Sequence, residues 1–555
     1  ANYMNGIPPI YRREAPLLTT PSARGCLPQR QPRRRTSRLL TALLLTAVPG
    51  QALAAGFALT EQSPAATGLA GALVARPDDA SAIYYNPAGL GFQSGLSVLG
   101  GVTLIVPSLS ATDYSSTAST NGVTYSTEPQ LIALPTVFVG ARLSDRWSIG
   151  VGGYSGFGSS VSWQDGQQAG AAQPFPGRFL AQRSSLTTFT INPTVAVRPI
   201  PEISLGFGVD VVLGSVNQTQ SLPLQTMTGP AEGQLQLSGG STGVGANFGA
   251  LVRLWDGRFN FGLHYRTAVK LAFPDVALQA TLPAGTAFPY TTAQTELPLP
   301  HSITTGVAVK PSEWLTVSVD LISTLWQDLH AQRLSLPPVL APDGDKLAPA
   351  QVLTTQRSLE ATYSGRLGLE GDLGGLVPSG SKVVPKVRLG FGFDQTPVPA
   401  STLDSSLPDS SRVLTSVGAS LGYRGYGSLE LGYQAVMFRP RASENPQSQL
   451  SYTAQAHVFS AAVVLQLENV FGRRSPEFAG RQLTLTPPPA PTPGTEGTTP
   501  TPPTDPPTTP NQGPQDQVPT PSQGPAPSPQ QSPAQQQQSP AQQQQSPAQQ
   551  QQTQS

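Results

Sequence analysis

The chain has 555 residues, only 12% of which are charged, and its formal net charge is +1. This low, balanced charge excludes a protein that binds nucleic acid through a basic surface, so we expect no nucleic-acid partner. Glycine and proline number 55 and 58, which is an unusual composition for a globular enzyme. The length leaves room for one large domain with attached segments.

The N-terminal region has the features of a secretory signal peptide. A basic cluster at residues 33–38 precedes an apolar run at 39–48, and Ala52-Leu53-Ala54 supplies the small residues of a cleavage site. The apolar run is shorter than the roughly 20 residues that cross a bilayer as a helix. We therefore predict a signal peptide with an upstream extension over residues 1–54. The mature chain would contain no cysteine, because Cys26 lies before the cleavage site.

The next segment, residues 55–93, is rich in glycine and alanine and has no strand alternation. Its glycines argue against one long helix, and Asn86-Pro87 favours a turn. A flexible leader would have no use for the large apolar side chains in this segment, which are Phe57, Leu59, Ile83, Tyr84 and Tyr85. We therefore expect the segment to be compact and packed.

From residue 94 to residue 468 the sequence alternates between apolar and polar residues with a period of two. In "WLTVSVDLI", for example, Leu315, Val317 and Val319 share one face, and polar residues occupy the other. Such alternation predicts β-strands. We identify 14 segments, at 94–106, 130–142, 147–156, 186–198, 203–215, 244–255, 259–273, 302–310, 314–326, 358–373, 386–396, 412–424, 428–438 and 456–468.

The lengths of the segments and of their connections favour a membrane barrel over a soluble sandwich. Many segments are long enough for a tilted crossing, which takes roughly 9–11 residues. Short links such as "SDR", "DGR" and "PSE" alternate with long ones such as 107–129 and 157–185. Short turns on one side and long loops on the other are typical of outer-membrane barrels, and an even strand number places both barrel ends on the short-turn, periplasmic side.

The last part of the chain, residues 469–555, changes composition. A Pro/Thr-rich stretch is followed by three copies of "SPAQQQQ". Such a segment cannot bury a core, so we predict a disordered Pro/Thr/Gln-rich periplasmic tail. It would act as a spacer or as a tether to the cell wall or to a protein.

Several blocks, in order over residues 55–468, resemble the FadL/TodX family of outer-membrane transporters for hydrophobic compounds such as long-chain fatty acids. They include "AGFALTEQS", "DDASAIYYNPAGL" and "RLGFGFDQTPVPASTLDSSLPDSSR". The resemblance implies an all-β fold: a 14-stranded antiparallel transmembrane β-barrel over 94–468, plugged by an N-terminal hatch over 55–93, in the outer membrane of a Gram-negative bacterium. The hatch motif would be Asn86, Pro87 and Ala88. The tail has no counterpart in the family pattern.

The resemblance also suggests site residues. Family members bind fatty acids in an apolar pocket where the carboxylate meets cationic side chains, and Arg333, which follows Trp326, is similar in position. The expected second basic residue, after the fifth strand, is missing, so a neutral hydrocarbon stays open as the ligand. We expect the aromatic ligand contacts to be Phe157, Phe175 and Phe179.

In that family an inward kink of the third strand opens a side hole in the barrel wall. Glycine within a strand permits a bulge or bend. We therefore expect Gly156, Phe157 and Gly158 to form the kink of a lateral gate.

These features predict a channel for passive uptake of hydrophobic small molecules, captured by extracellular loops and released sideways through the kink. Its partners would be the ligand, outer-membrane lipid and the barrel-assembly machinery, and the chain would be a monomer. We expect no enzyme activity, no cofactor and no metal, because no histidine lies in a metal-spaced cluster or nucleophile motif. The alternative is a structural or adhesive barrel with a periplasmic tether and no transport.

Overall fold

The computed structural model of the protein describes residues 57–115, 121–164, 173–226, 229–284, 288–340 and 346–467. The predicted signal peptide and the predicted tail lie outside these residues.

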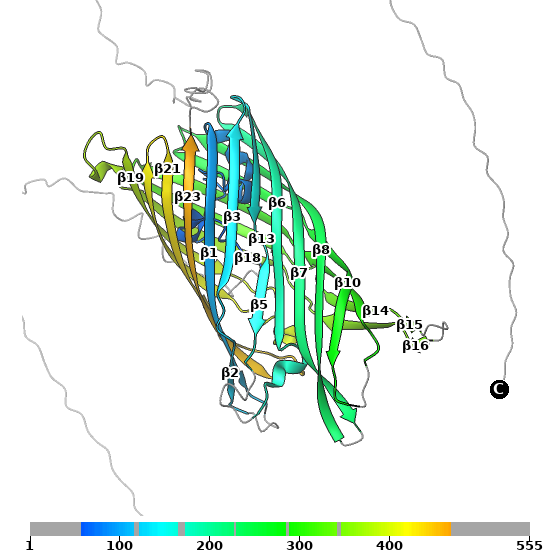
Figure 1. Ribbon diagram of the computed structural model, residues 1–555. Coiled ribbons are helices and arrows are strands. Elements are labelled where there is room, and N and C mark those ends of the chain that lie inside the picture. Colours follow the sequence, from blue (N-terminus) through cyan, green and yellow to red (C-terminus); the bar gives the residue numbers. More distant parts are fainter. Residues whose placement is uncertain are drawn as a thin grey trace, which may run out of the picture. The chain divides into compact units, whose positions relative to one another are not determined.

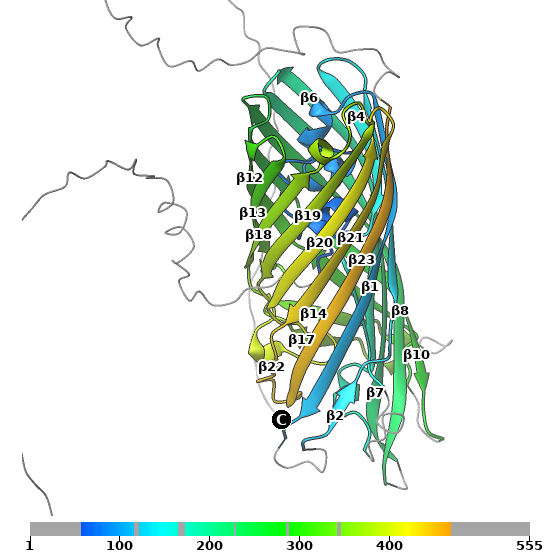
Figure 2. The same cartoon turned by 90° about the vertical axis from the view of Figure 1, so that its left-hand side faces the viewer.

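The described strands close into an antiparallel barrel of 14 strands, as the sequence predicts (Figures 1 and 2). Each wall strand pairs with its neighbours in sequence, and the last pairs with the first from Leu96↔Leu467 to Asp113↔Leu450. The wall strands are β1 (Leu96–Asp113), β3 (Ile132–Arg142), β4 (Trp147–Tyr154), β6 (Arg183–Ile200), β7 (Ile203–Thr226), β8 (Gly229–Leu254), β9 (Phe259–Arg266), β12 (His301–Ser312), β13 (Leu315–Leu325), β18 (Thr362–Asp372), β19 (Val383–Asp394), β20 (Arg412–Tyr423), β21 (Gly427–Phe438) and β23 (Leu450–Leu467).

Further short elements lie in the longer connections or continue a wall strand. The strands are β2 (Thr124–Ser126), β5 (Gly158–Ser162), β10 (Val269–Thr281), β11 (Thr292–Leu299), β14 (Ala331–Leu336), β15 (Val339–Leu340), β16 (Lys346–Ala348), β17 (Gln351–Gln356) and β22 (Arg441–Ala442). The 3-10 helices are η2 (Pro176–Phe179), η3 (Gly374–Leu376) and η4 (Ala400–Thr402). No described helix has the length and apolar character needed to cross a bilayer.

The barrel turns its polar side chains inward. In β13, Thr316, Ser318 and Asp320 are buried, whereas Val319 and Leu321 are exposed on the outer surface. This is the reverse of a soluble β-protein and matches a wall that faces lipid. At the short turns, a group of exposed aromatic residues forms a belt of the kind that marks a membrane interface: Trp147, Trp255, Trp314, Tyr423 and Tyr426.

Residues 57–93, called the plug below, fold inside the barrel near its short-turn end, where Figures 1 and 2 show the dark blue helices. The plug contains α1 (Pro64–Gly68), α2 (Ala82–Tyr85) and η1 (Pro87–Phe92). Ser63 caps α1 by accepting a hydrogen bond from the backbone N–H of Ala66 at 3.3 Å. The helices stay short because the segment must pack against the wall on all sides.

Charged groups join the plug to the wall. Arg76 of the plug forms an ion pair with Glu370 at 2.5 Å, and Arg388 pairs with Glu370 at 2.8 Å and with Glu430 at 3.2 Å. The Oδ2 atom of Asp320 accepts a hydrogen bond from the backbone N–H of Val74 at 2.8 Å. Because these wall side chains are buried, each depends on its partner to offset the loss of hydration.

Candidate functional site

The barrel wall is interrupted at its third strand. β3 pairs with β4 from Arg142↔Ser148 to Val137↔Gly153, but β5 pairs only with β6. The two sides meet again further along, where the backbone N–H of Glu128 donates to the carbonyl oxygen of Ser162 at 2.8 Å. Among the described residues, this leaves a window in the wall between 129–136 on one side and 154–161 on the other.

At the window the third strand pairs with the plug instead of with β3. The backbone N–H of Leu59 donates to the carbonyl oxygen of Gly156 at 3.0 Å, and that of Gly158 donates to the carbonyl oxygen of Phe57 at 2.9 Å. The hydroxyl of Thr188 also bonds both backbone groups of Phe157, at 3.1 and 2.6 Å. The strand therefore bends inward because the plug and β6 offer it new partners.

Of the two glycines of this bend, Gly158 supplies space, and neither supplies an unusual backbone conformation. Neither Gly156 nor Gly158 is among the described residues with a positive φ. A β-carbon at Gly158 would lie 2.9 Å from the Cδ1 atom of Leu59, so a larger residue there would press on the plug.

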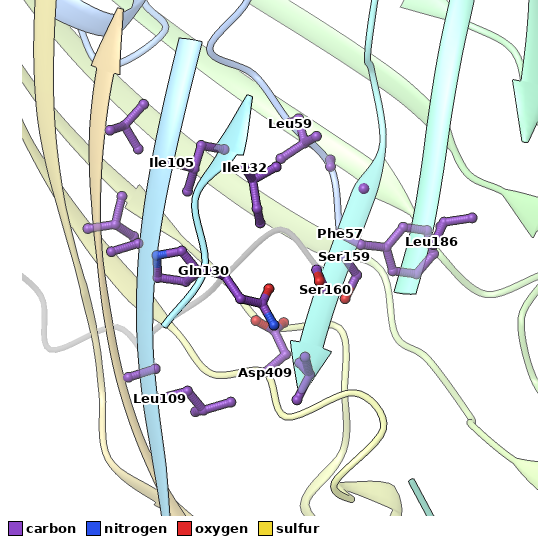
Figure 3. A pocket seen from close by; sticks show the side chains of 18 of the residues that line it. Phe57, Leu59, Ile105, Leu109, Gln130, Ile132, Ser159, Ser160, Leu186 and Asp409 are labelled. Atoms are coloured by element: carbon purple, nitrogen blue, oxygen red, sulfur yellow. The ribbon is translucent and has the colours of Figure 1, made fainter. Parts of the chain in front are cut away.

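A cavity of about 260 Å³ lies behind the window (Figure 3). Its walls come from the plug, β1, β3, β5, β6, the loop before β20, and the strands β20, β21 and β23. Most of the lining is apolar, and includes Phe57, Leu59, Ile105, Ile132, Leu134 and Leu186. Such a surface suits a hydrophobic ligand.

Three charged side chains line the same cavity: Glu61, Asp409 and Arg412. Arg412 donates from Nε to Asp394 at 3.0 Å, and Asp409 accepts from the hydroxyl of Thr396 at 2.8 Å. Burial raises the pKa of the Asp409 carboxyl above its ordinary range, and the charge of Arg412 only partly opposes this.

A second, smaller cavity of about 100 Å³ lies next to this one. The ring of Phe57 lies 4.6 Å from that of Trp326 and 6.2 Å from that of Phe157, measured between centroids. Phe157 and Ala58 line both cavities. The first residues of the plug and the bend of the third strand thus form the partition between them.

The structure brings only some of the predicted site residues to the cavity. Phe157 lines it. Phe175 is instead buried against the ring of Trp163, with centroids 4.6 Å apart. Phe179 is 36% exposed, and Arg333 is exposed on β14, where it does not line the cavity. The cationic side chain at the cavity is Arg412, which the sequence analysis did not single out although "LPDSSR" contains both it and Asp409.

The predicted hatch motif connects the plug to the wall. The Nδ2 group of Asn86 donates to the carbonyl oxygen of Val74 at 2.9 Å and to that of Ala250 on β8 at 3.0 Å. Its Oδ1 atom accepts from the backbone N–H of Ala88 at 3.2 Å and so caps η1, with Pro87 at the first position of that helix. One side chain therefore ends a turn, starts a helix and binds the barrel.

Within the described ranges, no three His, Cys, Asp or Glu side chains are grouped to hold a metal ion. The cavity contains apolar groups with a few polar ones at one end, which can bind a hydrophobic compound and orient it.

A closed barrel with an even number of strands, a lipid-facing apolar surface, an aromatic belt and short turns at one end defines an outer-membrane protein of a Gram-negative bacterium. The chain belongs to the family described as outer membrane protein transport protein (OMPP1/FadL/TodX), whose sequence profile matches residues 45–469. This family consists of transporters of hydrophobic compounds rather than enzymes.

Solved structures share the fold. A FadL homologue from Pseudomonas aeruginosa is 19% identical with a TM-score of 0.60, over 74% of this chain and 100% of that one. The P. putida toluene transporter TodX is 15% identical with a TM-score of 0.56, over 73% and 99%. The CymD monoaromatic hydrocarbon channel is 16% identical with a TM-score of 0.52, over 75% and 98%. No match was found among curated protein sequences.

Proposed function

We propose that this protein is a passive channel through which hydrophobic small molecules, long-chain fatty acids or related hydrocarbons, cross the outer membrane. The observation that carries the proposal is the apolar cavity whose lining includes residues from both sides of the wall window. Two relatives with the same fold are named as a toluene transporter and a monoaromatic hydrocarbon channel.

In this proposal the extracellular loops capture the ligand, which enters the cavity and leaves through the window into the lipid. Lateral release keeps an apolar solute out of water, which favours this exit over a path past the charged contacts between plug and wall into the periplasm. Phe157, at the bend between Gly156 and Gly158, would contact the ligand as it passes. Phe175, Phe179 and Arg333 would act earlier, in the loops.

The rest of the chain supports the channel in this proposal. Residues 1–54 direct export, residues 55–93 close the lumen as a hatch, residues 94–468 form the wall, and residues 469–555 act as a periplasmic spacer. The chain works as a monomer in outer-membrane lipid after insertion by the barrel-assembly machinery, and it catalyses no reaction.

The test is to close the window reversibly. Ile132 and Ser160 lie on opposite sides of it (Figure 3). Because the only cysteine is Cys26, within the predicted signal peptide, Ile132→Cys and Ser160→Cys can be joined selectively by a short bis-methanethiosulfonate. We expect uptake of a labelled hydrocarbon and of a labelled fatty acid to fall to the level of cells lacking the protein, and to recover after reduction.

Two controls make the result specific. Each single-cysteine variant receives the same reagent, and a Thr415→Cys, Ala435→Cys pair is joined across two strands that are already paired. Unchanged uptake with a joined window would reject lateral release. Absence of uptake in the untreated parent would favour the alternative, a structural or adhesive barrel with a periplasmic tether.

A further inference from the structure

The charged residues of the window cavity carry an excess of negative charge. Two carboxylates, Glu61 and Asp409, line it beside one guanidinium, Arg412. That guanidinium already has a carboxylate partner, since its Nε atom donates to Asp394, a carboxylate that it shares with Arg366. A ligand anion would have to share Arg412 with Asp394 and lie close to two further negative charges.

Neither lining carboxylate is held in a direct ion pair, although the charge of Arg412 acts on Asp409 from nearby. The Oε1 atom of Glu61 accepts from the hydroxyl of Thr60 and from the side-chain amide of Gln434, each at 2.9 Å. Asp409 accepts from Thr396. In the part of the chain that the structure describes, no lysine or arginine forms an ion pair with Glu61 or Asp409. Both therefore keep acceptor capacity at the edge of an apolar cavity.

Glu61 and Asp409 line the cavity, so a bound ligand can reach their carboxylate oxygens. Asp409 is 7% exposed and comes from the loop before β20, and Glu61 comes from the plug. Figure 3 shows Asp409 and Gln130 directed into the cavity, with the apolar side chains of β1, β3 and the plug around them. The cavity thus has one apolar body and one acceptor-rich end.

We propose that the cavity selects hydrophobic compounds whose single polar group donates hydrogen bonds, a hydroxyl or an amine, and discriminates against carboxylates. A donor can satisfy a lining carboxylate by a charge-assisted hydrogen bond. A ligand carboxylate would instead lose its hydration and meet like charges where the dielectric constant is low. The proposal rests on the proposed channel function and narrows its substrate class.

The experiment compares three probes with the same chain: dodecylamine, dodecanol and dodecanoate. Each competes at pH 7.5 with a bound fluorescent hydrocarbon on the purified mature protein in one uncharged detergent. We expect the amine and the alcohol to displace the fluorescent probe at concentrations about tenfold or more below that of the acid. The neutral alcohol separates donor recognition from simple charge attraction.

Two variants locate the effect. Asp409→Asn should reduce the advantage of the amine over the acid while leaving displacement by the alcohol close to that of the parent, because the amide still accepts. Asp275→Asn removes an exposed carboxylate on β10 outside the cavity lining, and its probe order should equal that of the parent. Both variants are checked for folding by heat-modifiable migration on a gel.

The outcomes are distinguishable. Dodecanoate binding as tightly as dodecanol, or more tightly, overturns the selectivity and leaves the channel proposal standing. An unchanged ratio of amine to acid affinity in folded Asp409→Asn shows that this carboxylate does not select, which also overturns it. Failure of the fluorescent hydrocarbon and of all three probes to bind removes the channel proposal itself, and the selectivity with it.

Discussion

At the scale of single residues, the close fit between plug and wall depends on glycines of the strands. A β-carbon at Gly206 would collide with the backbone of Pro87 and Ala88, and one at Gly249 would collide with the side chain of Asn86. Glycine lets backbone approach backbone at these positions, whatever the strand propensity of the neighbouring residues. Gly206 of "LGFGV" and Gly249 thus make room for the predicted hatch motif.

We expect Gly206→Val to displace the plug without preventing barrel formation. The valine side chain cannot share the space of the η1 backbone, whereas β-branched residues fit the strand itself. Planar-bilayer conductance to small ions should rise, and heat-modifiable migration on a gel should be retained. Gly100→Val is the matched control, because a β-carbon there meets nothing within 4 Å. Equal conductance in both variants would show that the η1 contact does not keep the plug in place.

At the scale of elements, the plug and the strands β18, β19 and β21 are joined by the chain of ion pairs Arg76, Glu370, Arg388 and Glu430. Glu370→Gln removes the carboxylate that two buried guanidinium groups share. Because Arg76 keeps Asp78 and Arg388 keeps Glu430, the loss should be smaller than the roughly 3–5 kcal/mol of a buried charge left without a partner. We expect plug amides over 64–92 to exchange hydrogen much faster in this variant, as measured by mass spectrometry.

Glu313→Gln is the control, because it breaks the ion pair between Glu313 and Arg258 at the surface. The side chain of Glu313 is 84% exposed and that of Arg258 is 61% exposed. Such surface pairs contribute about 0–1 kcal/mol, so plug exchange should equal that of the parent. Exchange in Glu370→Gln at the rate of this control would contradict a role for the ion pairs in holding the plug.

The elements also show why alternation predicts some strand boundaries and misses others. β13 was predicted at 314–326 and spans Leu315–Leu325, because one face meets lipid and the other the lumen. β7 extends to Thr226, and β8 begins at Gly229. Both strands therefore include residues between the predicted segments 203–215 and 244–255, which were predicted to be a loop. In "NQTQS" neither face is apolar, so the pattern that reports burial fades although the strand continues. In "EGQLQLS" the alternation is present, with Leu235 and Leu237 on one face, and the prediction overlooked it.

Interruptions within a strand are also difficult to predict from the two-residue alternation of apolar and polar side chains. The seventh segment was predicted to be continuous over 259–273, but β9 ends at Arg266 and β10 begins at Val269. The cavity residues were missed for a different reason. Asp409 and Arg412 are neighbours in "LPDSSR", but they share a cavity with Glu61 and the third strand only in the folded barrel, and no local pattern contains that arrangement.

At the scale of the whole molecule, barrel closure places the first and last wall strands side by side, and the even strand count makes them antiparallel, so that the start of β1 at Leu96 pairs with the end of β23 at Leu467. These ends lie with the short turns, and the long connections lie at the other end. Outer-membrane barrels have short periplasmic turns and long extracellular loops. The end of the barrel with the short turns, where the first strand begins and the last strand ends, is therefore the periplasmic end.

This orientation can be tested with epitopes of one kind at three positions. Gln447 is exposed in a long connection, and Gly380 is exposed in a turn on the opposite side. We expect antibody to label intact cells with an epitope inserted at Gln447, and to label those with an epitope at Gly380 or after Ser555 only once the outer membrane is permeabilised. Labelling of the Gly380 epitope on intact cells would invert the barrel. Labelling after Ser555 alone would mean that the tail crosses to the surface, which the even strand count does not allow without a further crossing.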